Sequence, residues 1–147
     1  MPNVGLEAAK MTSPLERMKK LVVCSILQKL AGFGMKKPFN PILGETVNAT
    51  IGDFNVYMEQ ICHHPPISNF QIDSEKHPEF SVDGSFEVRA YTSMNSIKGS
   101  ILGPLNYNFK TDGAKVVMHN SANKVGSIMS SKKRTVRVID SLTFQDE

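Results

Sequence analysis

The sequence predicts a mainly β domain in which one N-terminal helix precedes a curled antiparallel sheet. Three observations lead to this class. An amphipathic stretch begins at Ser13, and short runs rich in β-branched and aromatic residues follow it at regular spacing. Residues 80–90 alternate apolar and polar side chains without a break, which is typical of a strand with one buried and one solvated face.

The helix is expected to begin at Ser13. This residue can cap it, Pro14 suits the first helical position, and Glu16 completes the spacing of a capping box. Gly32 and Gly34 are expected to end it. The apolar stripe predicted for this helix consists of Leu15, Met18, Val22, Leu27 and Leu30, widened by Leu21, Val23 and Ile26. A stripe this broad favours a core helix over a basic amphipathic helix that lies on a membrane.

Residues 36–45 are expected to form a stiff loop, because two prolines and a glycine within seven residues are incompatible with a regular helix. Lys36 and Lys37 lie at its start. A stiff loop of this kind can aim backbone N–H groups and an ammonium group at a single anion. The alternative is a plain connector whose lysines face the solvent.

After this loop, turns divide the chain into strands. Gly52 and Asp53 are expected to form the tight turn of a β-hairpin. The predicted strands cover residues 46–51, 54–61, 67–72, 80–90, 96–102, 105–109, 116–119, 125–129 and 135–144. No repeat or linker divides the sequence, so residues 1–147 are expected to form a single domain, with residues 1–12 poorly ordered. A chain of this length can bury about 70% of its unfolded surface.

The most unusual local feature is the pair His63 and His64, which two prolines follow. The prolines stiffen the backbone, and His64 is expected to be extended at the end of the strand 54–61. The two rings would then point to opposite faces, unless a bulge turns both the same way. Because imidazoles gain a proton near neutral pH, two of them suit an anion, a metal ion or an acid–base step. A purely structural role is the alternative.

The net charge is +3, and the cations are unevenly distributed. Residues 113–139 contain no acidic side chain but hold Lys115, Lys124, Lys132, Lys133, Arg134 and Arg137. Such a stretch favours an anionic membrane, nucleic acid or phosphate; a solvated face is the alternative. Cys24 and Cys62 are too few for a disulfide framework or a cysteine-type zinc site, so reduced thiols in an intracellular protein are expected. No apolar run approaches about 18 residues, and any membrane contact is expected to be peripheral.

Two motifs resemble the lipid-binding domain of the oxysterol-binding protein family. The first motif is Lys37-Pro38-Phe39-Asn40-Pro41-Ile42-Leu43-Gly44-Glu45. The second is Glu59-Gln60-Ile61-Cys62-His63-His64-Pro65-Pro66, which is similar to the family signature Glu-Gln-Val-Ser-His-His-Pro-Pro. The segment 13–18 also resembles the helix that precedes the first motif in that family, and the clearest resemblance spans residues 13–110. Cys62 replaces the usual serine, so a strong hydrogen-bonding hydroxyl is lost.

The resemblance implies a near-complete antiparallel β-barrel around a lipid tunnel, of which this chain would hold the N-terminal part. A lid before the helix and a C-terminal segment that completes the phosphate site are expected to be missing. Such domains carry a lipid between membranes without vesicles, and many exchange a sterol or phosphatidylserine for phosphatidylinositol 4-phosphate. The inositol 4-phosphate head group would meet Lys37, the backbone at Phe39 and Asn40, and both His63 and His64.

Elementary chemistry agrees with this assignment, because a phosphomonoester carries about −1.5 to −2 charges and three acceptor oxygens. An ammonium, two imidazoles and loop N–H groups are matching donors, and charge-assisted bonds of this kind contribute about 1.5–3 kcal/mol each. The acyl chains need an apolar interior, for which the alternation suggests the inner faces of Phe54, Val56, Phe86 and Val88.

Lipid binding and transfer is therefore the leading hypothesis, with no cofactor or metal, in the cytoplasm and peripherally at intracellular membranes. The second hypothesis is a structural or interaction protein without cargo. An incomplete sheet leaves an open edge, at which two chains could pair as a dimer. The third is an enzyme that uses His63 and His64, but no acidic or cysteine cluster at metal spacing supports it. The fourth is nucleic-acid binding, which lacks a recognisable motif and is not expected.

Overall fold

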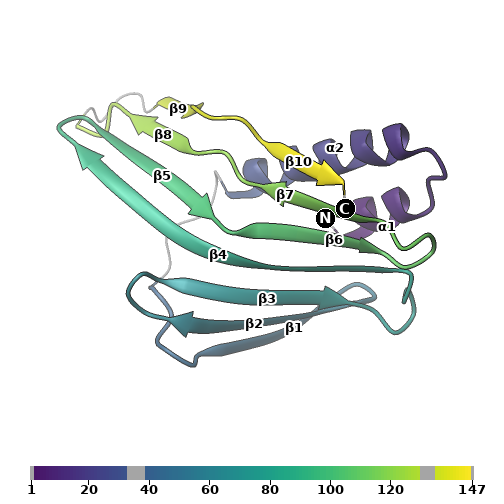
Figure 1. Ribbon diagram of the computed structural model, residues 1–147. Helices are drawn as coiled ribbons and strands as arrows, with labels where there is room; N and C mark the ends of the chain where they lie inside the picture. Colours follow the sequence, from purple (N-terminus) through teal and green to yellow (C-terminus); the bar gives the residue numbers. More distant parts are fainter. Residues whose placement is uncertain (1, 33–38, 130–134, 147) are drawn as a thin grey trace.

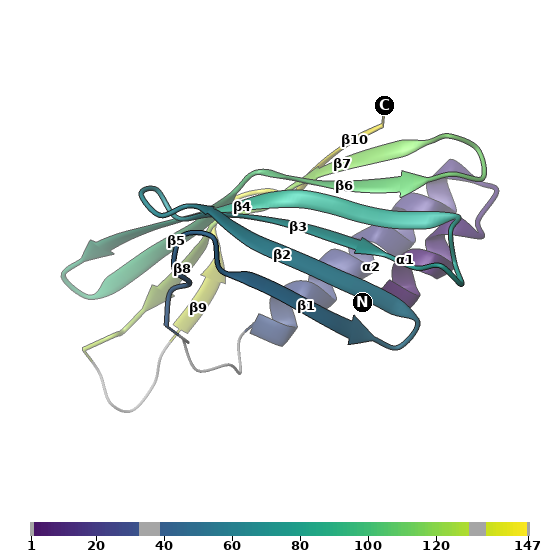
Figure 2. The same cartoon turned by 90° about the horizontal axis from the view of Figure 1, so that it is seen from below.

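A computed structural model describes residues 2–32, 39–129 and 135–146. Two helices, α1 (Pro2–Ala9) and α2 (Pro14–Gly32), lie on one side of a curled antiparallel sheet (Figure 1; Figure 2). The strands are β1 (Thr46–Ile51), β2 (Phe54–Cys62), β3 (Ile67–Asp73), β4 (Phe80–Ser93), β5 (Ser96–Leu102), β6 (Pro104–Phe109), β7 (Lys115–His119), β8 (Asn123–Gly126), β9 (Thr135–Val138) and β10 (Thr143–Asp146). The predicted class is confirmed: the fold is mainly antiparallel sheet, and the described strands do not close into a barrel.

The long strand β4 organises the sheet, because it takes two partners along one side. Residues 80–84 pair with β6 and residues 87–93 pair with β5, while β3 pairs with the other side. Gly103 lies where the partner changes, with a φ of +104°. A Cβ at this position would lie 2.3 Å from the carbonyl oxygen of Ser85, so only glycine fits.

The remaining strands extend the sheet in both directions from β4. On one side, β3, β2 and β1 follow in turn. On the other side, β7 pairs with β6 and β10, while β8 pairs with β5 and β9. Among the described residues, the outer sides of β1, β9 and β10 pair with no strand. The sheet therefore has two open edges, as expected for an incomplete barrel. One edge is β1, and the other consists of β9 and β10.

Phe80 lies at the centre of the core beneath α1. Its ring meets Phe54 edge-on at a centroid distance of 6.3 Å and is tilted against Phe109 at 5.7 Å. A Cβ on Gly5 would lie 2.2 Å from this ring, so α1 rests directly on it. The expectation that residues 1–12 are poorly ordered is therefore wrong for the described residues 2–12. A helix this short is marginal alone, and burial of its apolar side chains, including Leu6, stabilises it here.

The helix α2 begins and ends close to the predicted residues, although Gly34 lies outside the described residues. Its predicted apolar stripe is confirmed only in part: Met18 packs against the core as expected. Leu21 is fully buried, whereas Leu15, Val23, Ile26 and Leu27 are exposed. Arg17 is buried instead: it donates to Asp112 at 2.5 Å and lies 4.5 Å from the centroid of the Phe109 ring. An ion pair and a cation–π contact thus offset the cost of burying this charge.

The strand predictions are most accurate before residue 110. The bounds of β1 and β5 are as predicted, and β4 continues three residues further, to Ser93. The predicted strand 135–144 is divided into β9 and β10, because residues 135–138 pair with β8 whereas residues 143–146 pair with β7. The predicted strand 125–129 corresponds to β8, which begins and ends a few residues earlier in the chain.

Candidate functional site

The two histidines lie in the turn between β2 and β3. Residues 63–66 form this turn, so His64 follows the strand instead of extending it. The pairing register shifts between Gln60 and Cys62, which is a β-bulge. Both rings are exposed, and their centroids lie only 4.5 Å apart. Of the two orientations considered from the sequence, the structure has the one in which the rings lie together.

The loop that contains the first motif is joined to β2 just before this turn. The Gly44 N–H donates to the Gln60 carbonyl at 2.8 Å, and the Gln60 N–H donates to the Glu45 carbonyl at 3.0 Å. The Glu45 carboxylate in turn accepts from the Ile42 N–H at 2.9 Å. Backbone hydrogen bonds therefore hold the described part of the loop near the histidine turn.

Of the other predicted site residues, the structure describes Phe39 and Asn40. Lys37 lies outside the described residues. Phe39 and Asn40 are exposed on the loop, and the Phe39 side chain is 99% exposed. The structure thus brings His63 and His64 together, with the loop bonded to the same strand. Within the described parts of the chain, no group of three or more His, Cys, Asp or Glu side chains is arranged to hold a metal ion.

A cavity of about 810 Å³ is lined by residues of both helices and by the concave face of the sheet. Most of its wall is apolar. Its apolar lining includes Val56, Met58, Phe70, Ile72, Val82, Phe86, Ile101, Leu105, Val125 and Val136. This is the size range and character of sites for small lipophilic ligands.

Only part of the predicted apolar interior lines this cavity. Val56 and Phe86 line it, as expected from the alternation. Phe54 is buried in the core against Phe80 instead. Val88 is half exposed, because the second half of β4 extends beyond the helices.

One wall of the cavity is polar, which the sequence did not reveal. It is formed by Cys24, Gln28 and Lys29 of α2 together with Tyr107, Asn120 and Asn123. Among the described residues, the buried Asn123 Oδ1 has no hydrogen-bond partner. The Tyr107 hydroxyl lies beside Ser25, Cys24 and Gln28, which interact with it. A buried acceptor without a partner is costly, so the Asn123 Oδ1 is suited to a donor on a ligand. Leu21, Cys24 and Gln28 follow the i, i+3, i+7 spacing of one helix face, and Leu21 is buried. This spacing is the signal by which the α2 part of the polar wall could have been found in the sequence.

Burial shifts the ionisation of this wall toward neutral forms. It raises the pKa of the Tyr107 phenol and of the Cys24 thiol, and it lowers the pKa of the Lys29 amine. The polar wall therefore offers neutral donors and acceptors, together with one partly desolvated amine.

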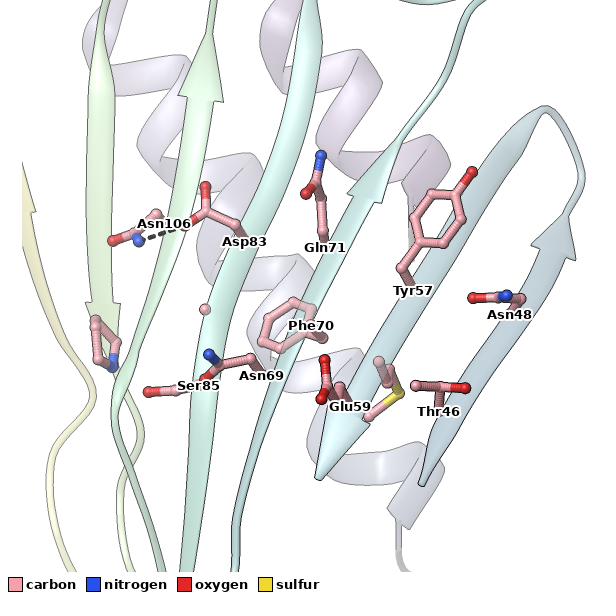
Figure 3. Close-up of a pocket in the computed structure, with 13 residues that line it drawn as sticks. Thr46, Asn48, Tyr57, Glu59, Asn69, Phe70, Gln71, Asp83, Ser85 and Asn106 are labelled. Carbon is pink, nitrogen blue, oxygen red and sulfur yellow. Dashed lines mark hydrogen bonds between the residues drawn. The ribbon is translucent and has the colours of Figure 1, made fainter. Parts of the chain in front are cut away.

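The convex face has a shallower hollow of about 620 Å³ (Figure 3). Figure 3 shows Asn106, Asp83, Gln71, Tyr57 and Asn48 in a row, and the strand registers place each opposite the next. The Asp83 carboxylate accepts hydrogen bonds from Asn106 at 2.7 Å and from Asn108 at 2.6 Å. This polar face gives no apolar interior, so the concave cavity is the candidate site for a lipid.

Comparison with known proteins agrees with these features. The family model described as "Oxysterol-binding protein" matches residues 4–146, which extends beyond the segment 13–110. Oxysterol-binding protein 9 of Dictyostelium discoideum is 36% identical over 110 residues, which cover 74% of this chain and 25% of that protein. Oxysterol-binding protein-related protein 8 of Homo sapiens is 35% identical over 123 residues, covering 76% and 13% respectively. The chain therefore spans a quarter or less of these two relatives.

Two solved structures share the fold. The Osh1 ORD domain in complex with cholesterol superposes with a TM-score of 0.86 at 21% identity, covering 99% of this chain and 36% of that one. The Osh3 ORD in complex with PI(4)P from Saccharomyces cerevisiae gives a TM-score of 0.76 at 18% identity, covering 97% and 38%. The sheet and helices thus correspond to about a third of those chains.

The fold, the histidine turn and the apolar cavity define a partial antiparallel β-barrel with an apolar cavity beside its helices. The chain belongs to the oxysterol-binding protein family. This family consists of lipid-binding proteins and not of enzymes. No helix in the described parts of the chain is both long and apolar enough to cross a bilayer.

Proposed function

We propose that this chain binds phosphatidylinositol 4-phosphate and a second lipid, and that it takes part in lipid transfer between membranes. The cavity on the concave face is the observation that carries the proposal. It combines an apolar lining with a polar wall that includes the unpartnered Asn123 Oδ1, which is the pattern of a site for an amphipathic ligand. The relationship to a solved complex with cholesterol and to one with PI(4)P supports both lipid classes.

In this proposal, the head group binds outside the cavity, at the histidine turn. His63 and His64 lie side by side and are exposed, so both rings can donate to one phosphate. Asn40 and the backbone at Phe39 would contribute from the loop that is bonded to Gln60. Lys37 would supply an ammonium to the same anion, as the resemblance implies.

The second lipid is a sterol or phosphatidylserine. A sterol is the better fit to the polar wall, because its single hydroxyl can both donate and accept. The unpartnered Asn123 Oδ1 needs a donor, and the Tyr107 hydroxyl can supply or accept the other bond. The protein would act in the cytoplasm, in peripheral contact with intracellular membranes.

A structural or interaction protein without cargo is the second candidate. Two open sheet edges and the exposed apolar side chains of α2 favour it, because such surfaces tend to bind other chains. Pairing of two copies through an open edge would give a dimer.

Thermal unfolding with a water-soluble, short-chain phosphatidylinositol 4-phosphate separates the two candidates. A binder is stabilised by its ligand, by about 2.7 kcal/mol at 100 times the dissociation constant, or a rise in Tm of roughly 8 °C. Short-chain phosphatidylinositol, which lacks the 4-phosphate, is the matched control and should have a smaller effect. An unchanged Tm with both lipids would contradict lipid binding and favour the interaction protein.

A further inference from the structure

Three cations lie in a row across the neighbouring strands β5, β8 and β9. Figure 1 shows β8 and β9 at the end of the sheet that is far from α1. Lys98 of β5 lies directly opposite Lys124 of β8, which lies directly opposite Arg137 of β9. Tyr91 of β4 continues the row on the other side of Lys98. Directly opposed side chains on one sheet face lie about 4.5–5.5 Å apart at Cβ, so the three charges are neighbours.

This cationic row is on the convex, solvent-facing side of the sheet. The neighbours Val125 and Val136 line the cavity, as does Ile101 of β5. Because alternate residues of a strand face opposite sides, Lys98, Lys124 and Arg137 point away from the cavity. All three are exposed.

The row is not explained by the fold. Like charges that lie directly opposite one another destabilise a sheet. Within the described residues, no acidic side chain forms an ion pair with Lys98, Lys124 or Arg137. Glu87, which lies four residues before Tyr91 on β4, is already bonded to Arg89 at 2.5 Å. The repulsion would be relieved by an anionic partner that spans all three strands.

Apolar side chains beside the row indicate the kind of partner. Met94, at the tip of the β4–β5 hairpin, is 89% exposed, and Met129 is 77% exposed. The Met129 N–H donates to Asn95 Oδ1 at 3.1 Å, which holds the two methionines at the same tip. Cations combined with exposed apolar side chains and a tyrosine are typical of surfaces that bind the interface of an anionic bilayer. A nucleic-acid surface would not need the methionines.

We propose that this face, with Lys98, Lys124 and Arg137 at its centre and Met94 and Met129 at its tip, docks on the surface of an anionic membrane. The face uses none of the residues of the proposed head-group site. Docking here would hold the protein at a membrane whether or not phosphatidylinositol 4-phosphate is present.

Flotation with phosphatidylcholine vesicles, with and without phosphatidylserine and free of phosphatidylinositol 4-phosphate, tests the proposal on the full chain. The test variant is Lys98→Gln/Lys124→Gln/Arg137→Gln. The matched control is Lys10→Gln/Lys19→Gln/Lys110→Gln, which removes the same charge from positions just after α1, within α2 and just after β6. Wild type and control should bind the phosphatidylserine vesicles, and the test variant should bind about 100-fold more weakly. Binding should also weaken as salt rises from about 0.1 M to about 0.5 M.

Thermal unfolding of the test variant excludes misfolding as the cause. Because the substitutions remove repulsion between like charges, its Tm should equal or exceed that of the wild type. Equal binding by the test variant and the wild type, or equal losses in both triple variants, would overturn the proposal. The proposal would also be overturned if the protein bound RNA through Lys98, Lys124 and Arg137 but did not bind the vesicles. The double variant His63→Ala/His64→Ala should bind these vesicles normally, so failure of the head-group site is distinguishable.

Discussion

Replacing both histidines of the turn, His63→Ala with His64→Ala, should weaken selective binding to phosphatidylinositol 4-phosphate vesicles by at least about 100-fold. Each charge-assisted bond to the phosphate contributes about 1.5–3 kcal/mol, and two such bonds are lost together. Both rings are exposed in a turn, so the substitutions should leave the fold intact. Flotation with vesicles that differ only in this lipid measures the effect.

His119→Ala is the matched control for this variant, because His119 is an exposed histidine of β7, outside the histidine turn. It should bind like the wild type. If the double variant kept the wild-type selectivity, the head-group site would have to lie elsewhere, and the motif would be a feature of the fold alone.

Phe80→Ala should lower the free energy of unfolding by about 3–5 kcal/mol, a large share of the total of about 5–15 kcal/mol expected for a domain. The Phe80 ring is 1% exposed and joins α1 to the strands through Gly5, Phe54 and Phe109. Its removal leaves a cavity beneath a helix that depends on this contact. Denaturant unfolding gives the size of the loss, and hydrogen exchange of the α1 amides should become faster.

Phe39→Ala makes the same chemical change on the exposed loop, where the side chain is solvated. Its free energy of unfolding should remain within about 0.5 kcal/mol of the wild type. Similar losses for both variants would mean that Phe80 does not occupy the core as described.

Most of the sheet could be predicted because its signals are local. The unbroken alternation of residues 80–90 is the signal for β4, and Gly52 with Asp53 marks the hairpin between β1 and β2. The helix α1 could not be found in this way, because it is stabilised by contact with Phe80 and not by its own propensity. The burial of Arg17 depends in the same way on Asp112, ninety-five residues further along the chain.

The same distinction between local signals and long-range contacts applies to the candidate site. His63 and His64 are adjacent in sequence and lie in one turn, so the proximity of their rings depends on local structure alone. The polar wall of the cavity joins residues of α2 to Tyr107 and Asn123, whose meeting depends on how the helix crosses the sheet. The cationic row likewise depends on strand register, which no single segment specifies.

Native mass spectrometry after incubation with vesicles tests most directly the central claim that this chain takes up a lipid in its cavity. Vesicles that contain phosphatidylinositol 4-phosphate and a sterol should give complexes with one lipid per chain. Ile101→Trp, which adds bulk at a partly exposed position of the cavity wall, should remain folded and lose most of the complex. A wild-type protein that stays free of lipid, or a Trp variant that is loaded equally, would contradict the claim.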